Sequence, residues 1–181
     1  SLEEEVRETV KRLRKEVEDW LREVEKVLED LLRELKKSIE ETKKVAKELE
    51  DKLRDVKRRN VDEDEVRRLK EEAKRTIEEL EKKNKELERK IEKIVRELRE
   101  KDKELDKRVE DVLDELRKRL TDERIRRTLE KAREEVKRLS AETKRLIEEV
   151  KRRLDELLKR DNDIIDDARR RVKKVLDEIE T

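Results

Sequence analysis

The chain has 181 residues, of which 62% are charged and 30% hydrophobic, and its 57 basic and 56 acidic side chains leave a net charge of +1. It contains no Gly, Pro, Cys, Met, His, Tyr or Phe. The lack of His and Cys excludes disulfide bonds, ordinary zinc sites, Glu-x-x-His di-iron motifs and His-activated nucleophiles, and the lack of Gly excludes glycine-rich phosphate loops.

Three runs of apolar residues follow one another along the chain, over residues 2–56, 66–116 and 125–179. Within each run they recur at alternating steps of three and four, which places them on one stripe of an α-helix. So high a fraction of charged residues is also found in disordered chains and in solvated single helices, but neither of these requires a continuous apolar stripe. Shifts of the stripe near residues 28–39 and 139–147 predict nearly straight helices instead of a tight coiled coil.

Capping residues mark the start of the first helix and the break that follows it. Ser1 and Glu4 form a capping box, and Asp62 and Glu65 form a second one. Asn60 is the residue of this break that best tolerates the left-handed conformation found at helix C-termini. The first helix is therefore predicted to end just before residue 60 and the second to begin just after residue 62.

The second break is predicted at residue 121. Thr121 is the candidate N-cap of the third helix, with acidic residues directly after it. Leu120 and Ile125 flank this cap as a hydrophobic staple, as Val61 and Val66 flank the first break.

These breaks divide the chain into helices of about 58 residues, over residues 2–59, 63–119 and 122–180, each roughly 87 Å long. A loop at residues 161–163 is an alternative, but it would divide the third helix unequally, so a continuous helix is preferred. Short connections make successive helices antiparallel neighbours. The expected fold is therefore all-α, an elongated up-down-up antiparallel three-helix bundle that forms a single domain over residues 1–181.

Polar residues interrupt the apolar stripes at heights that match between helices. With turns near residues 61 and 121, they gather in two sets that each draw on all three helices. One set is Ser38, Thr42, Thr76, Asn84, Asp161 and Asn162, and the other is Trp20, Asp102, Ser140 and Thr143. We interpret them as a structural polar core, since a polar layer is satisfied in only one helix register. The alternative is that they bond to their own helix or to water, with Trp20 as an ordinary core residue.

Catalytic, metal-binding and cofactor-binding residues are not apparent, so we expect no enzyme activity and no cofactor. Carboxylates are abundant, but at this composition they belong to solvated faces. The densest basic run, at residues 169–174, follows several aspartates and has no aromatic residue for base stacking, so nucleic-acid binding is not expected. No stretch approaches the ~20 apolar residues of a membrane span, and no targeting signal is present. We expect a soluble protein without a natural location, made by recombinant cytoplasmic expression.

In its glycine-free charged surface, its capping boxes such as Ser1-Leu2-Glu3-Glu4 and its matched polar layers, the chain resembles de novo designed helical bundles with buried hydrogen-bond networks. The resemblance covers the whole chain in patterning and implies a monomeric, thermostable scaffold without biological activity or a required partner. One alternative is a designed interaction module (a binder, a heteromer subunit or a self-associating block), because Leu21, Leu28 and Leu32 widen the first stripe. The other is a natural structural spacer.

Overall fold

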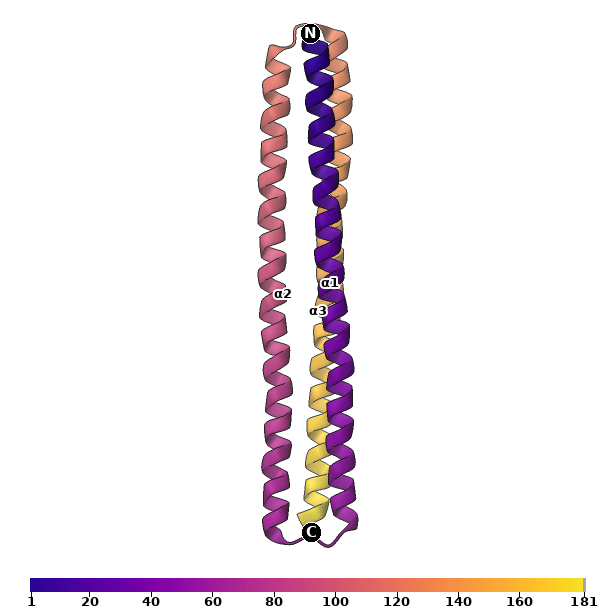
Figure 1. Cartoon of the computed structure of the whole chain (residues 1–181), viewed down its shortest axis with the longest axis vertical. Coiled ribbons are helices and arrows are strands. Elements are labelled where there is room, and N and C mark those ends of the chain that lie inside the picture. The colour runs from indigo at the N-terminus through magenta and orange to yellow at the C-terminus, as the bar shows by residue number, and fades with distance from the viewer. Residues whose placement is uncertain (181) are drawn as a thin grey trace. The chain divides into compact units, whose positions relative to one another are not determined.

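The computed structural model describes residues 1–180 and contains three α-helices, α1 (Leu2–Arg58), α2 (Glu63–Arg119) and α3 (Glu123–Glu180). The helices have 57, 57 and 58 residues and pack together as a three-helix bundle (Figure 1). Their bounds agree with the predicted ones to within a residue. α3 continues without interruption through residues 161–163, so the alternative of a loop there is wrong.

Side-chain oxygens cap the start of each helix. The amide of Glu4 donates to Ser1 Oγ (3.3 Å) and the amide of Glu65 donates to Asp62 Oδ1 (2.9 Å), which confirms these two predicted caps. The prediction of Thr121 as the third cap is wrong, because the amide of Arg124 donates to Asp122 Oδ1 at 2.8 Å. α3 begins one residue later than predicted, and the carboxylate of Asp122 also suits the positive end of the helix.

The C-termini of α1 and α2 close without a left-handed residue. No residue among 1–180 has a positive φ, so Asn60, which tolerates the left-handed conformation, does not adopt it. Instead, the amide of Arg59 donates to the carbonyl of Val56 (3.1 Å), and the amide of Leu120 donates to that of Arg117 (3.2 Å). These tight final turns satisfy carbonyls that a left-handed cap would otherwise serve.

The chain divides into two compact units, and each takes a segment from all three helices. Unit 1 comprises Ser1–Asp30 and Lys93–Arg152. Within it, the N-terminus lies beside the connection between α2 and α3 (Figure 1). Ion pairs join Arg119 to Glu5 (2.8 Å) and Arg108 to Glu16 (2.9 Å). The start of α1 thus lies beside the end of α2, as expected for antiparallel helices. One cluster of the hydrophobic core of unit 1 consists of Val6, Leu13, Val17, Val109, Leu113, Leu116, Leu120, Leu129 and Val136.

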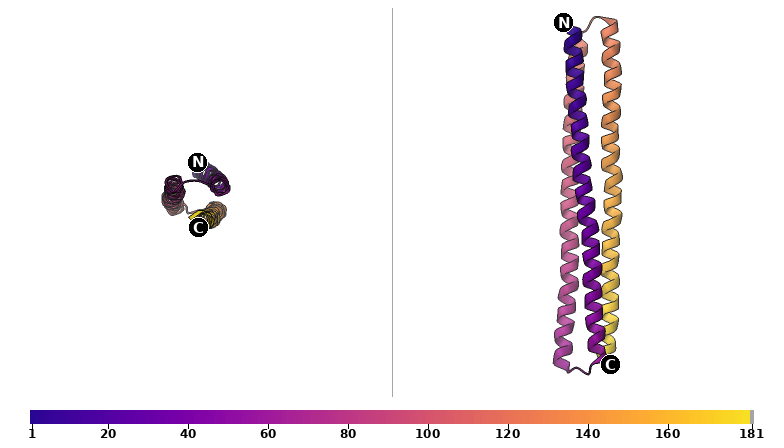
Figure 2. Two further views of the ribbon diagram at one scale, coloured as in Figure 1. Left: turned by 90° about the horizontal axis from the view of Figure 1, so that it is seen from below. Right: turned by 45° about the vertical axis from the view of Figure 1, so that its right-hand side comes forward.

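Unit 2 comprises Leu31–Glu92 and Arg153–Thr181, of which Thr181 lies outside the described residues. Ion pairs join α1 to α2 along it, including Lys90 to Glu34 (2.9 Å) and Lys52 to Glu72 (2.7 Å). Seen from below, its helical segments surround a common interior (Figure 2). One cluster of its hydrophobic core consists of Leu49, Leu53, Val56, Leu69, Ala73, Ile77, Leu80, Ile165, Ala168, Val172, Val175 and Leu176.

Candidate functional site

A tryptophan and an aspartate meet in the interior of unit 1. Trp20 of α1 and Asp102 of α2 are only 8% and 4% exposed, and Trp20 Nε1 donates a hydrogen bond of 3.0 Å to Asp102 Oδ1. Both side chains point into the bundle, because each residue occupies a position of its helix where the three-and-four spacing of the apolar stripe calls for an apolar residue. The bond therefore links two helices through groups that have little access to water.

The same aspartate is linked to α3 by a lysine. Lys144 Nζ lies 3.7 Å from Asp102 Oδ2 and also forms an ion pair with Asp106. The half-buried Ser140 donates its hydroxyl proton to Asp106, not to Asp102. Asp106 and Lys144 were not predicted, although each follows a predicted polar residue of its own helix by four positions, which puts it on the same helix face.

In unit 2 the buried polar contact joins α2 to α3. Asn84 and Asp161 are each 1% exposed, and Asn84 Nδ2 donates a hydrogen bond of 2.7 Å to Asp161 Oδ2. A buried carboxylate is costly unless it is paired or hydrogen-bonded. This amide is the hydrogen-bond partner of Asp161 within the described chain, so the two side chains depend on each other.

The other predicted polar residues do not bridge helices in this way. The hydroxyls of Thr42, Thr76 and Thr143 donate to backbone carbonyls four positions earlier in their own helices, at 2.9, 2.9 and 3.2 Å. This is the alternative that the sequence left open for such residues. Ser38 is half-buried, and Asn162 is exposed, because it follows the buried Asp161 by one residue and so points to a different side of α3.

A second charged contact in unit 1 was not predicted. The side chain of Arg133 on α3 is only 12% exposed, and it forms ion pairs with Glu110 and Asp114 of α2, the latter at 2.7 Å. Hydrogen bonds from Asp114 and then Glu110 raise the pKa of this guanidinium above its ordinary value, against the opposing effect of burial. In a chain with 57 basic residues, no sequence signal distinguishes this arginine from the others.

Replacing Arg133 with methionine is expected to reduce the free energy of unfolding by about 1 kcal/mol, because two half-exposed carboxylates lose their shared cation. Guanidinium chloride unfolding followed by circular dichroism measures the change. Arg138→Met is the matched control on the same helix, and since Arg138 is exposed, this variant should change stability by no more than about 0.5 kcal/mol. Equal effects of the two substitutions would contradict the assignment.

Exposed ion pairs shift the pKa values of two glutamates. A hydrogen bond from Arg119, together with its charge, lowers the pKa of Glu5 in unit 1. Lys57 lowers the pKa of Glu178 in unit 2 in the same way. Because folding lowers these pKa values, each contact stabilises the protein at neutral pH, and the contribution is lost as the pH falls through the folded-state pKa.

Replacing Arg119 with methionine is expected to raise the pKa of Glu5 toward its ordinary value, since both the hydrogen bond and the positive charge are removed. A pH titration of the side-chain carboxyl carbon by NMR measures this change. The pKa of Glu178 serves as an internal control and should stay the same, because its partner Lys57 is intact. A Glu5 titration that does not move would show that Arg119 is not the cause.

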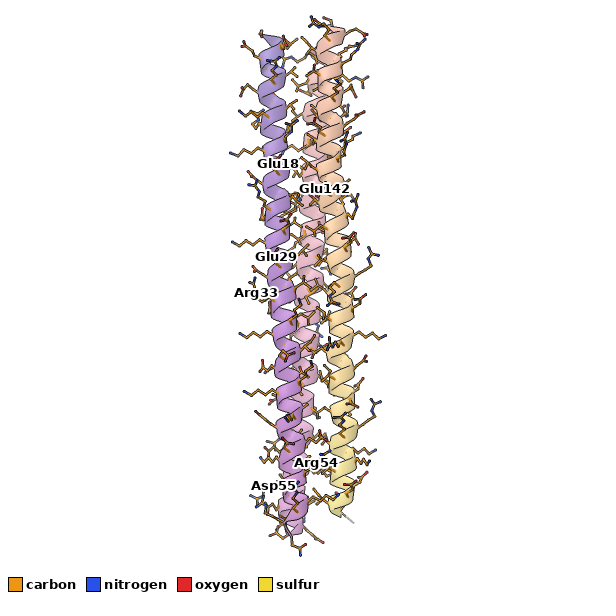
Figure 3. All side chains as sticks on the ribbon, turned by 90° about the vertical axis from the view of Figure 1, so that its right-hand side faces the viewer. Glu18, Glu29, Arg33, Arg54, Asp55 and Glu142 are labelled. Carbon is orange, nitrogen blue, oxygen red and sulfur yellow. The ribbon has the colours of Figure 1, made fainter. Side chains whose placement is uncertain are left out.

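Grooves on the surface are lined by charged side chains that pair with one another. In unit 2, a groove between α1 and α3 is bordered by Arg54 and Arg171, and both form ion pairs with Glu50. Figure 3 shows Arg54 on the side of α1 toward α3 and Asp55 on the other side. Among residues 1–180, no group of three or more acidic side chains converges to hold a metal ion, and no helix has the length and apolar character of a membrane span.

The fold is similar to that of a solved structure described as a "Computationally designed three helix bundle". The two chains are 23% identical, the similarity covers 98% of this chain and 92% of that chain, and the TM-score is 0.58. No protein-family model matches the chain, and no curated protein sequence matches it. At this identity the similarity concerns the fold, and it agrees with three long helices packed as a bundle.

Proposed function

We propose that the chain is a designed structural scaffold without catalytic activity, in which buried polar contacts specify how the helices pair. The hydrogen bond between Asn84 and Asp161 carries this proposal, because two side chains that are each 1% exposed meet there across two helices. Trp20 and Asp102 make the equivalent contact in unit 1. The glycine-free composition and the similarity in fold to a designed bundle support the designed origin.

The physical argument concerns the cost of wrong pairings. An apolar layer tolerates a helix that slides by one turn, because Leu, Val and Ile contacts are non-directional. A slid helix would separate Asn84 from Asp161, and each buried group without a partner costs about 1–3 kcal/mol. The polar pairs thus oppose alternative registers more than they stabilise the native one.

The alternative of an interaction module has little support from the surface. Leu28 is 1% exposed, and Leu21 and Leu32 are half-buried. Within residues 1–180 no large hydrophobic side chain is exposed. The wider stripe of α1 is therefore accounted for by packing within the bundle, as a helix that contacts two neighbours requires.

The test uses a variant in which both polar pairs become apolar, here called the apolar variant: Trp20→Phe, Asp102→Leu, Asn84→Leu and Asp161→Leu. Light scattering coupled to size-exclusion chromatography is expected to show a monomer for the original chain and a mixture of oligomers for the apolar variant. A matched control is Thr42→Val with Thr143→Val, which removes two buried hydroxyls that bond within their own helices. An apolar variant as uniformly monomeric as this control would argue against the proposed role.

A further inference from the structure

The contact between Asn84 and Asp161 leaves two buried oxygens without a partner. Asn84 Oδ1 and Asp161 Oδ1 have almost no solvent-accessible surface, and no group of the described chain donates a hydrogen bond to either. A carboxamide oxygen and a carboxylate oxygen are both acceptors. Whatever satisfies them must therefore supply at least two donors or a positive charge.

The hydroxyl of Thr42 on α1 does not supply these donors. The ion pair between Lys83 and Glu41 sets α1 beside this part of α2, so that the buried Thr42 lies at about the height of Asn84. The hydroxyl proton of Thr42 is already donated to the carbonyl of Ser38 at 2.9 Å. The hydroxyl of Thr42 therefore supplies no donor to either oxygen.

The corresponding aspartate of unit 1 has no such deficit. Asp102 Oδ1 accepts from Trp20 Nε1, and Asp102 Oδ2 lies 3.7 Å from Lys144 Nζ. Both of its oxygens thus have a donor group or a cation nearby. The deficit at Asp161 is therefore not a general property of the buried aspartates. A buried oxygen of Glu130 also accepts no hydrogen bond, but the charged Nε of Arg117 lies 3.6 Å from it.

We propose that Asn84 and Asp161 form a binding site for one internal water molecule, which donates one hydrogen bond to Asn84 Oδ1 and the other to Asp161 Oδ1. Internal water molecules in proteins typically bind two to four polar groups that would otherwise be unsatisfied. Water has two donors, and this site has two orphaned acceptors. The inference does not depend on the proposed role of the pair in helix pairing.

The test is a water-to-protein cross-relaxation NMR experiment on the Asn84 side-chain amide in the full chain. The original protein is expected to show a dipolar cross-peak from a long-lived water, with the sign that distinguishes it from proton exchange. The cross-peak should persist in Thr42→Val, because that hydroxyl does not donate to either oxygen. In Asp161→Asn it should be lost, because the new amide can donate to Asn84 Oδ1 directly.

Two results would overturn the proposal. One is the absence of the cross-peak in the original protein together with a carboxyl carbon shift of Asp161 that indicates a protonated acid, which would mean that the two oxygens share a proton. The other is a change of the Asn84 amide resonances on exchanging sodium for potassium, which would assign the site to a cation. Neither result depends on the oligomeric state, so failure here is distinguishable from failure of the proposed function.

Discussion

Replacement of Asn84 by leucine is expected to lower the free energy of unfolding by about 3–5 kcal/mol, because it leaves Asp161 as a buried acid without its protein donor. Asp161 is 1% exposed and accepts its hydrogen bond, at 2.7 Å, from the amide that this substitution removes. Guanidinium chloride unfolding at elevated temperature, followed by circular dichroism, measures the loss.

The double variant Asn84→Leu with Asp161→Leu should behave in the opposite way. When both polar partners become apolar groups of similar size, the desolvation cost disappears, and such replacements are often neutral or stabilising by about 1–4 kcal/mol. Stability should therefore fall in the single variant and recover in the double one. Asp161→Leu is the second single variant of this comparison. If the double variant lost as much stability as the two single variants together, the two side chains would not depend on each other.

Replacement of Trp20 by alanine is expected to cost about 3–5 kcal/mol, which is typical of a large buried aromatic side chain. Trp20 is 8% exposed, and its loss both empties space in unit 1 and removes the donor to Asp102. The same denaturant experiment applies, followed by circular dichroism because the substitution removes the only tryptophan.

Trp20→Phe separates these two contributions, since it keeps an aromatic ring but removes the indole N–H. Its cost should be smaller, about 1–3 kcal/mol, because Lys144 remains 3.7 Å from the carboxylate of Asp102. A Trp20→Phe variant as stable as the original protein would show that the hydrogen bond between Trp20 and Asp102 contributes nothing.

The helices could be predicted from the sequence because their signals are local and redundant. Apolar periodicity and the capping residues Ser1 and Asp62 fix the elements to within a residue. The errors lie where two neighbouring residues compete for one role. Thr121 and Asp122 are both good N-caps, and the register of the first turn of α3 selects Asp122. Asn60 tolerates a left-handed conformation, but tolerance does not require it, and α1 closes with a tighter turn instead.

The partners within the polar layers were harder to predict than their heights. Height depends only on helix length and turn position, whereas partners depend on the rotation of each helix and on side-chain reach. Threonine hydroxyls can reach a carbonyl one turn earlier in their own helix, and Thr42 and Thr143 do so. Asp106 lies one turn after Asp102 on the same face of α2, but its pairing with Ser140 was missed because acids one turn from an inward-facing residue are common in a chain with 56 acidic residues.

Because the chain has no cysteine, spin labels can be placed at chosen sites to measure helix register. Labels on Glu23→Cys and Glu104→Cys report α1 against α2 in unit 1, and labels on Glu86→Cys and Lys159→Cys report α2 against α3 in unit 2, all at exposed positions. If the polar pairs specify helix pairing, double electron–electron resonance will give one narrow distance per label pair in the original chain and several distances in the apolar variant. The same single distance in both proteins would contradict that role, whatever the difference in their stability.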